Sequence, residues 1–341
     1  MNSLTGTKSS WQPIMTADTT ASGYWLNWRV LLCSIWVMIS LTLSVLLIWR
    51  FEGLRNSRRN NNNNNSRVTQ QEEETIGTLY EDETWRPCLK GIHPAWLLAF
   101  RLVAFFVLLV LLIITACVDG GTIFYFYTQW TFTLITIYFG LGSLLSIRGC
   151  YRYHKKTSGE RVDNVEVDSE QGTIEKSVGP HVEEQHQPRH PAGILGYVFQ
   201  IIFQMNAGAV ILTDCVFWFI IVPFLTIKDY NLNFLIINMH TINAVFLLGE
   251  TALNCLPFPW FRIGYFYLWT ITYVVFQWIC HACVKFWWPY PFLDLSSPYA
   301  PLWYFSVGLL HFPCYGIFAL IMKLKHHLLS TRCPDSHQCG R

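Results

Sequence analysis

Seven long stretches of this chain carry almost no charge, and this pattern constrains the fold more than any other feature. They are residues 30–49, 96–118, 122–147, 192–227, 232–254, 263–284 and 301–322. About 20 mostly apolar residues in a helix are long enough to cross a hydrocarbon core of roughly 30 Å. Only 13% of all residues are charged, whereas soluble domains average about 25%. We therefore expect an all-α fold, a polytopic membrane bundle of about seven transmembrane helices.

The distribution of basic residues predicts how the helices run through the membrane. Nineteen Lys and Arg fall on one side of the predicted spans, and only four fall on the other side. Seven of the nineteen lie in residues 50–95 and seven in residues 148–191. Loops rich in Lys and Arg stay in the cytoplasm. We predict an N-terminus outside and a cytoplasmic C-terminus, in the endoplasmic reticulum or the plasma membrane.

The segments between the spans complete the predicted organisation. The chain begins with a polar outer tail (1–29), an N-terminal span (30–49) and a cytoplasmic loop with an Asn tract (50–95). Two spans (96–147), a second cytoplasmic loop (148–191), four spans (192–322) and a cytoplasmic tail (323–341) follow. Both loops are polar and poor in aromatic residues, so we predict that they are disordered. Residues 287–292, rich in Trp, Tyr and Phe, are predicted to form an interfacial aromatic belt.

The eleven cysteines do not indicate a disulfide scaffold, because most of them lie inside apolar runs. We expect those, Cys255 among them, to be small buried hydrophobic residues. Cys150, Cys333 and Cys339 lie near predicted cytoplasmic membrane ends and are candidates for palmitoylation.

Ionisable residues inside spans cost roughly 2.5–3.5 kcal/mol on insertion, so each is a functional candidate. His240 and Thr128 fall at similar depths in the outer half of the membrane. An imidazole beside a hydroxyl can activate an oxygen nucleophile, although His240 could equally bond a neighbouring helix. Asp214 is open to three interpretations: a proton relay, a partner for His240, or a neutral hydrogen-bonded acid. Three other hydroxyls in the third span are equally eligible by composition: Thr131, Thr133 and Thr136.

The other intramembrane polar residues are expected to be structural. Glu250 is predicted to anchor its helix, either by snorkelling to the membrane surface or by pairing with Arg101 or Arg262. His281 is predicted to pack or to lie at the interface. We expect no cofactor and no metal, because Cys280-x-x-Cys283 lies in an apolar helix. The net charge of +2 indicates no nucleic-acid partner. Membrane lipids are the expected partners, and the sequence does not indicate any protein partner.

Four short motifs follow one another between residues 97 and 322. They are Phe126-Tyr127-Thr128 with Tyr138-Phe139-Gly140, Val216-Phe217-Trp218, Met239-His240-Thr241 with Glu250, and Trp278-x-x-His281 with Tyr290-Pro291-Phe292-Leu293-Asp294. Together they resemble the motifs of the androgen-induced and androgen-dependent transmembrane protein family. A plant branch is the nearest resemblance, and the myoblast-fusion protein Rolling stone is a distant one.

The resemblance implies a chemistry. Members of that family with known activity are intramembrane threonine hydrolases that cleave esters of fatty acids with hydroxy fatty acids. It implies Thr128 as the nucleophile, His240 as the base and a fatty-acid ester as the substrate. The chain departs from the family in its added first span, in Asp214 and in Val245, where the family has Pro.

The alternative is a non-enzymatic seven-span membrane protein: a proton-linked carrier, a receptor or adaptor, or a structural protein. A carrier would use Asp214, His240 and Glu250 for protons. The sequence contains no visible inverted repeat and no pair of helices broken by Gly or Pro, which argues against a carrier.

Overall fold

The computed structural model describes residues 17–53, 77–168, 189–223 and 234–339. Within these ranges, seven helices are long and apolar enough to cross a membrane. The helices are α1 (Ser22–Trp25), α2 (Trp28–Ile48), α4 (Pro94–Asp119), α5 (Tyr127–Asp168), α6 (Ile194–Val216), α8 (Phe234–Met239), α9 (Ile242–Leu253), α10 (Ile263–Cys283) and α11 (Ala300–Arg332). The prediction of an all-α, multi-pass membrane protein with seven candidate spans is confirmed.

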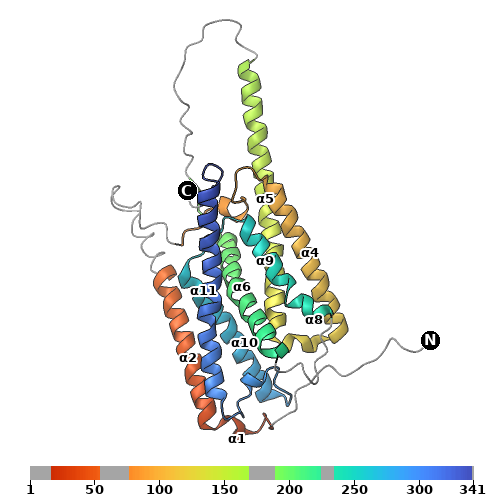
Figure 1. The fold of residues 1–341 in the computed structure, drawn as a ribbon, viewed down its shortest axis with the longest axis vertical. Coiled ribbons are helices and arrows are strands. Elements are labelled where there is room, and N and C mark those ends of the chain that lie inside the picture. The colour runs from red at the N-terminus through yellow and green to blue at the C-terminus, as the bar shows by residue number, and fades with distance from the viewer. Residues whose placement is uncertain (1–16, 54–76, 169–188, 224–233, 340–341) are drawn as a thin grey trace, which may run out of the picture.

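The long helices run alternately up and down through one bundle (Figure 1). Helix α6 is central, because it packs against α5, α9, α10 and α11. The added first helix, α2, packs on α10 and α11 at the side of the bundle. We call the end that carries residues 77–93, 189–193, 254–262 and 333–339 the upper end. The end that carries α1 and residues 120–126 and 284–299 is the lower end.

Local sequence signals explain where the first two long helices begin and end. The Asn27 side chain accepts hydrogen bonds from the backbone N–H groups of Arg29 and Val30, at 2.9 and 3.2 Å, and so caps α2. Helix α4 begins with Pro94 in its first turn, where the missing N–H costs nothing. It ends at Gly120, whose φ of 73° is open to glycine at little cost.

Aromatic stacking and small residues bring α5, α6 and α10 close together. The Tyr138 ring on α5 lies flat against the Phe199 ring on α6, with centroids 4.6 Å apart. On the other side of α6, Gly208 faces the buried ring of Phe266 on α10. A Cβ at Gly208 would lie 2.4 Å from that ring.

This close approach carries a stability prediction. Changing Gly208 to Ala forces either the Phe266 ring or a helix to move, so we expect a loss of about 1–3 kcal/mol. Gly316 on α11 is the matched control, because a Cβ there meets nothing within 4 Å. The midpoint of thermal unfolding in detergent measures both variants. Equal midpoints for the two variants would contradict the tight α6–α10 contact.

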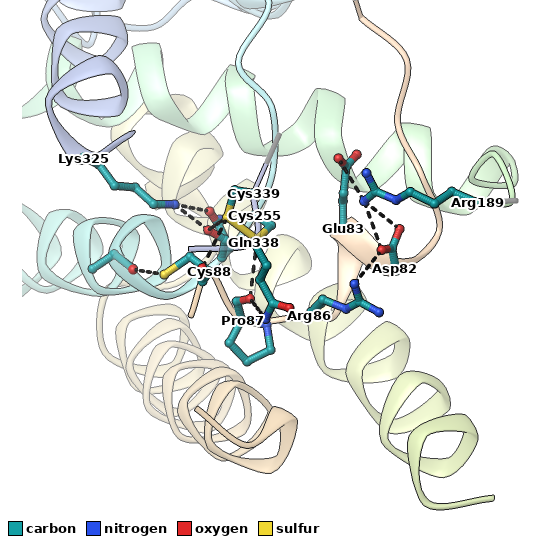
Figure 2. Close-up of a disulfide and its surroundings, with 12 residues drawn as sticks. Asp82, Glu83, Arg86, Pro87, Cys88, Arg189, Cys255, Lys325, Gln338 and Cys339 are labelled. Carbon is teal, nitrogen blue, oxygen red and sulfur yellow. Dashed lines mark hydrogen bonds and ion pairs between the residues drawn. A yellow bond between two sulfur atoms is a disulfide. The ribbon is translucent and has the colours of Figure 1, made fainter. Parts of the chain in front are cut away.

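The upper end is more ordered than the sequence predicts. Residues 77–93 fold over it, with Leu79 and Cys88 buried, and the Arg189 side chain bonds both carboxylate oxygens of Asp82, at 3.1 and 3.0 Å (Figure 2). The prediction of disorder over 50–95 is therefore wrong for residues 77–93, because a few apolar and ion-paired side chains supply enough contacts. The Asn tract lies outside the described residues.

The second predicted disordered loop, 148–191, is also helical in its first part. Helix α5 continues without interruption to Asp168, since no Pro or Gly cluster stops it. Arg152, on that extension, forms an ion pair with Glu81 and so ties α5 to residues 77–93. Residues 169–188 lie outside the described part of the chain.

A disulfide at the upper end corrects the expectation for two cysteines. Cys255, just after α9, is bonded to Cys339 in the C-terminal tail (Figure 2). Cys255 is thus not merely a small hydrophobic residue, and Cys339 has no free thiol to be palmitoylated. The tail also pairs with residues 87–90: Leu89 forms a β-bridge with His337, and Lys90 N–H donates to the Ser336 carbonyl at 2.8 Å.

At the lower end, the aromatic segment 287–292 turns inward. Trp288 and Tyr290 are buried in the same cluster as Tyr127 and Phe266. The prediction of an interfacial belt is wrong for these two side chains. The reason is tertiary: after α10 the chain folds back over the bundle, as the hydrogen bond from Trp288 Nε1 to the Tyr24 hydroxyl at 3.0 Å illustrates.

Candidate functional site

Two helix irregularities lie next to each other in the lower half of the bundle. Helix α6 passes into a π-helical turn at Phe217–Ile221, a distortion found frequently at functional sites. The predicted fifth span is broken at His240 and Thr241, between α8 and α9. The Trp218 indole N–H donates to the His240 carbonyl at 3.1 Å and so joins the two irregularities.

This break differs from the sequence prediction. Residues 232–254 form one apolar run with no Pro in it, so one continuous helix was expected there. The break instead accompanies contacts with the end of α6, since Trp218 bonds the His240 carbonyl and Phe217 covers its ring. Broken helices are sites of ligand and ion binding in many membrane proteins.

Asp214 and His240 form a carboxylate–imidazole pair at these irregularities. His240 Nδ1 lies 3.4 Å from Asp214 Oδ1. The imidazole stacks on the Phe217 ring, with centroids 3.7 Å apart and planes 2° from parallel. His240 is 7% exposed and Asp214 is 15% exposed. Of the three interpretations left open for Asp214, the geometry shows the partner for His240.

Thr128 lies at the start of α5 beside a phenol that the sequence did not single out. Its hydroxyl is 3.5 Å from the Tyr290 hydroxyl. Tyr290 lies between α10 and α11, and burial raises the pKa of its phenol, so that this hydroxyl stays protonated and can donate a hydrogen bond. The packing of the Tyr290 ring edge-to-face with Phe126 holds it there.

Neighbouring side chains connect the Thr128 region with the His240 region. The Gln129 amide N–H donates to the Met239 sulfur at 2.7 Å, and these two residues adjoin Thr128 and His240. Counted along the antiparallel helices from the Tyr138–Phe199 stack, Thr128 is ten residues away and Asp214 is fifteen, so their depths differ by about one and a half helical turns. No hydrogen bond joins Thr128 to His240 in the described part of the chain.

The other threonines of α5 have different surroundings. The Thr136 hydroxyl donates to the Phe132 carbonyl at 2.8 Å, as a helix-satisfied hydroxyl does. The hydroxyls of Thr131 and Thr133 are buried and make no hydrogen bond within the described residues. Among the four candidates, Thr128 alone has a side-chain hydroxyl within hydrogen-bonding distance in the part of the chain that the structure describes.

Glu250 and Arg101 form a fully buried ion pair nearer the upper end. Arg101 Nη2 lies 2.5 Å from Glu250 Oε1, and Arg101 Nε is 3.1 Å from both carboxylate oxygens. Tyr138 donates a hydrogen bond to the same carboxylate at 3.0 Å. Of the two expected partners of Glu250, Arg101 forms the ion pair. Arg262 pairs instead with Glu52, at 2.7 Å.

His281 is packed in an aromatic pocket. Its ring lies between Trp288 and Phe286, with centroid distances of 3.6 and 4.0 Å, and its Nδ1 is 2.7 Å from the Gln277 carbonyl oxygen. The described residues contain no group of three or more His, Cys, Asp or Glu arranged to hold a metal ion.

Comparison with known protein families, with curated proteins and with solved structures finds no match. Asp214 and His240 stand out in the sequence because ionisable side chains are conspicuous in apolar spans, whereas only the family resemblance singles out Thr128 among the four threonines. The sequence did not single out Tyr290 beside Thr128, because the neighbours of Tyr290 are contributed by segments far apart in the sequence.

Proposed function

We propose that this multi-pass membrane protein is an intramembrane hydrolase of fatty-acid esters. The observation that supports it best is the Asp214–His240 pair at a helix break, next to Met239, whose sulfur accepts a hydrogen bond from the neighbour of Thr128, Gln129. A carboxylate that holds an imidazole is the usual means of making a hydroxyl nucleophilic. The resemblance to the androgen-induced family, on the motifs that contain Thr128 and His240, agrees with this chemistry.

In the proposed reaction, Thr128 Oγ attacks the ester carbonyl carbon while His240 takes the hydroxyl proton. Asp214 orients the imidazole and balances its positive charge. The C–O bond to the alcohol then breaks, and His240 returns the proton to the departing oxygen. Water next attacks the acyl–Thr128 ester, with His240 again as the base, and releases the fatty acid.

Tyr290 supplies what a hydrolase also requires, a donor for the developing oxyanion. Helical backbone N–H groups are already bonded, so a side-chain donor is needed here. The Tyr290 hydroxyl lies next to the Thr128 oxygen, where a substrate carbonyl would approach. Thr128 and His240 must come closer or share a bridging water for the proton transfer, since catalytic hydrogen bonds are often long before substrate binds.

Covalent labelling tests this proposal. Membranes that contain the protein are treated with a fluorophosphonate probe, and hydrolysis of a fatty acid–hydroxy fatty acid ester is measured in parallel. We expect Thr128→Ala and His240→Ala to lose both labelling and hydrolysis, and Tyr290→Phe to slow hydrolysis by roughly 10²–10³-fold. Thr133→Ala, on the same helix, is the matched control and should keep both. Labelling that persists in Thr128→Ala would overturn the assignment of the nucleophile.

A proton-linked carrier is the second candidate, and the broken helix at His240 and Thr241 favours it. A buried Asp–His pair at such a break can carry a proton. This function would need Asp214 and His240 but not Thr128. Uptake driven by a proton gradient that survives Thr128→Ala and fails in Asp214→Asn would support the carrier and exclude the hydrolase.

A further inference from the structure

A basic pocket opens at the upper end, far along α5 from the site just described. Its volume is about 160 Å³. The wall includes Arg148 and Arg152 on α5, Trp85 in the segment before α4, and Gly193 and Gly196 at the start of α6. Three separate parts of the chain thus enclose one cavity.

The pocket has an excess of positive charge. Arg148 is exposed and makes no hydrogen bond within the described part of the chain. Arg152 uses one terminal nitrogen for Glu81, the one acidic residue in the wall. The neighbouring acidic side chains are already engaged, since Asp82 pairs with Arg86 and Arg189.

The start of α6 adds a second attraction for an anion. The first N–H groups of a helix have no partner inside the helix, and no side chain caps α6 at Gly193. The amide groups and the helix dipole therefore favour negative charge at this point. Two guanidinium groups and one uncapped helix end converge on the same cavity, and this combination suits a phosphate group.

Glycines give the pocket its shape. The Trp85 indole lies so close to α5 that a Cβ at Gly149 would be 2.2 Å from it. Gly196 approaches Ala192 and Thr84, with its Cβ position 2.9 Å from Ala192 Cβ. The cavity wall is thus built by close packing and is not a gap between loosely placed loops.

Exposed apolar side chains lie next to two of the wall residues along the chain. Ile147 precedes Arg148 on α5 and is 48% exposed, and Ile194 in the first turn of α6 is 85% exposed. In a membrane-spanning helix such side chains face acyl chains. A ligand with a phosphate group at one end and hydrocarbon at the other matches both surfaces.

We propose that this pocket binds the headgroup of an anionic phospholipid whose phosphate group contacts Arg148, Arg152 and the start of α6. Basic pockets between transmembrane helices bind such headgroups, chiefly on the cytoplasmic side, where the charge distribution predicts the upper end to lie. The acyl chains then run beside Ile147 and Ile194. This site is separate from the proposed hydrolase residues and does not depend on their function.

The residue at position 193 allows a sharp test. Gly193 has an ordinary φ of −72°, and a Cβ there meets nothing within 4 Å, so a side chain fits. Asp and Asn are both good helix caps, and both variants should fold at least as well as the natural chain. Gly193→Asp places a negative charge in the pocket, whereas Gly193→Asn places a neutral side chain of the same shape there.

The measurement is binding of short-chain phosphatidic acid to the purified full-length protein, by thermophoresis and by native mass spectrometry. We expect Gly193→Asp to weaken binding by at least about fivefold relative to Gly193→Asn, and Arg148→Ala to weaken it by about fivefold. Arg332→Ala is the control, because Arg332 is an exposed basic residue at the same end but outside the pocket. Short-chain phosphatidylcholine should bind far more weakly.

Three results would overturn the proposal. Equal binding by Gly193→Asp and Gly193→Asn would show that the phosphate group does not enter this pocket. An effect of Arg332→Ala as large as that of Arg148→Ala would show attraction to the total charge of the upper end only. Inorganic phosphate that binds as tightly as phosphatidic acid would show an anion site with no role for the acyl chains.

Discussion

Replacing Arg101 with Met is expected to destabilise the protein by about 3–5 kcal/mol, because the change leaves the Glu250 carboxylate charged and buried. Both side chains are completely buried. Arg101 also donates to the Thr84 carbonyl at 2.8 Å and to the Ser146 hydroxyl at 2.7 Å. One guanidinium group therefore ties α4 to α5, to α9 and to residues 77–93. Thermal unfolding in detergent and the yield of monodisperse protein measure the loss.

A double variant separates the charge from the packing. Changing Arg101 to Met and Glu250 to Leu removes both charges, and a buried pair replaced by apolar residues is often neutral or better. We expect the double variant to be more stable than Arg101→Met alone. The Tyr138 hydroxyl and the Thr84 carbonyl then lose a partner, so recovery should be incomplete. A double variant less stable than the single one would show that the pair acts mainly through its other hydrogen bonds.

The second large effect is expected from the Cys255–Cys339 disulfide. Replacing either cysteine with Ser should lower stability by roughly 2–5 kcal/mol, toward the upper part of that range because the bond closes a loop of 84 residues. The bond holds the tail against residues 87–90. We expect the lost stability to appear as a lower unfolding midpoint and as faster proteolysis of residues after 333.

Cys333→Ser is the matched control for this prediction, since Cys333 lies in the same tail and its thiol is free. It should unfold like the natural protein. Reductant should lower the midpoint of the natural protein to that of Cys339→Ser and leave Cys339→Ser unchanged. A natural protein that is insensitive to reductant would contradict a stabilising role for the bond.

The sequence predicts the seven spans well because hydropathy is a local property that each helix carries by itself. It predicts less where contacts between distant segments determine the local structure. The composition of residues 77–93 is too polar to indicate order. Leu79, Glu83 and Thr84 are nevertheless buried, because the ends of α5 and α6 cover them. The extension of α5 to Asp168 was missed because charge alone does not stop a helix.

The same division applies to the candidate site. Asp214 and His240 stand out in apolar runs, and the structure brings them together. No local sequence pattern indicates the helix break after Met239 or the position of Tyr290 beside Thr128. The first accompanies contacts with Phe217 and Trp218, and the second follows from the return of the chain over the lower end after α10.

The disulfide at the upper end also makes the thiols of the tail a reporter of membrane orientation. Cytosolic thiols are kept reduced, whereas those in the secretory lumen and outside the cell form lasting disulfides. The basic residues predict that the upper end faces the cytosol. In that setting the bond would close only under oxidising conditions, and the C-terminal tail would be fastened or released with the redox state of the cell. In intact cells, labelling of the free thiol of Cys333 with a membrane-impermeant reagent would therefore report the orientation of the protein, and alkylation of Cys339 before and after reduction would report the state of its tail.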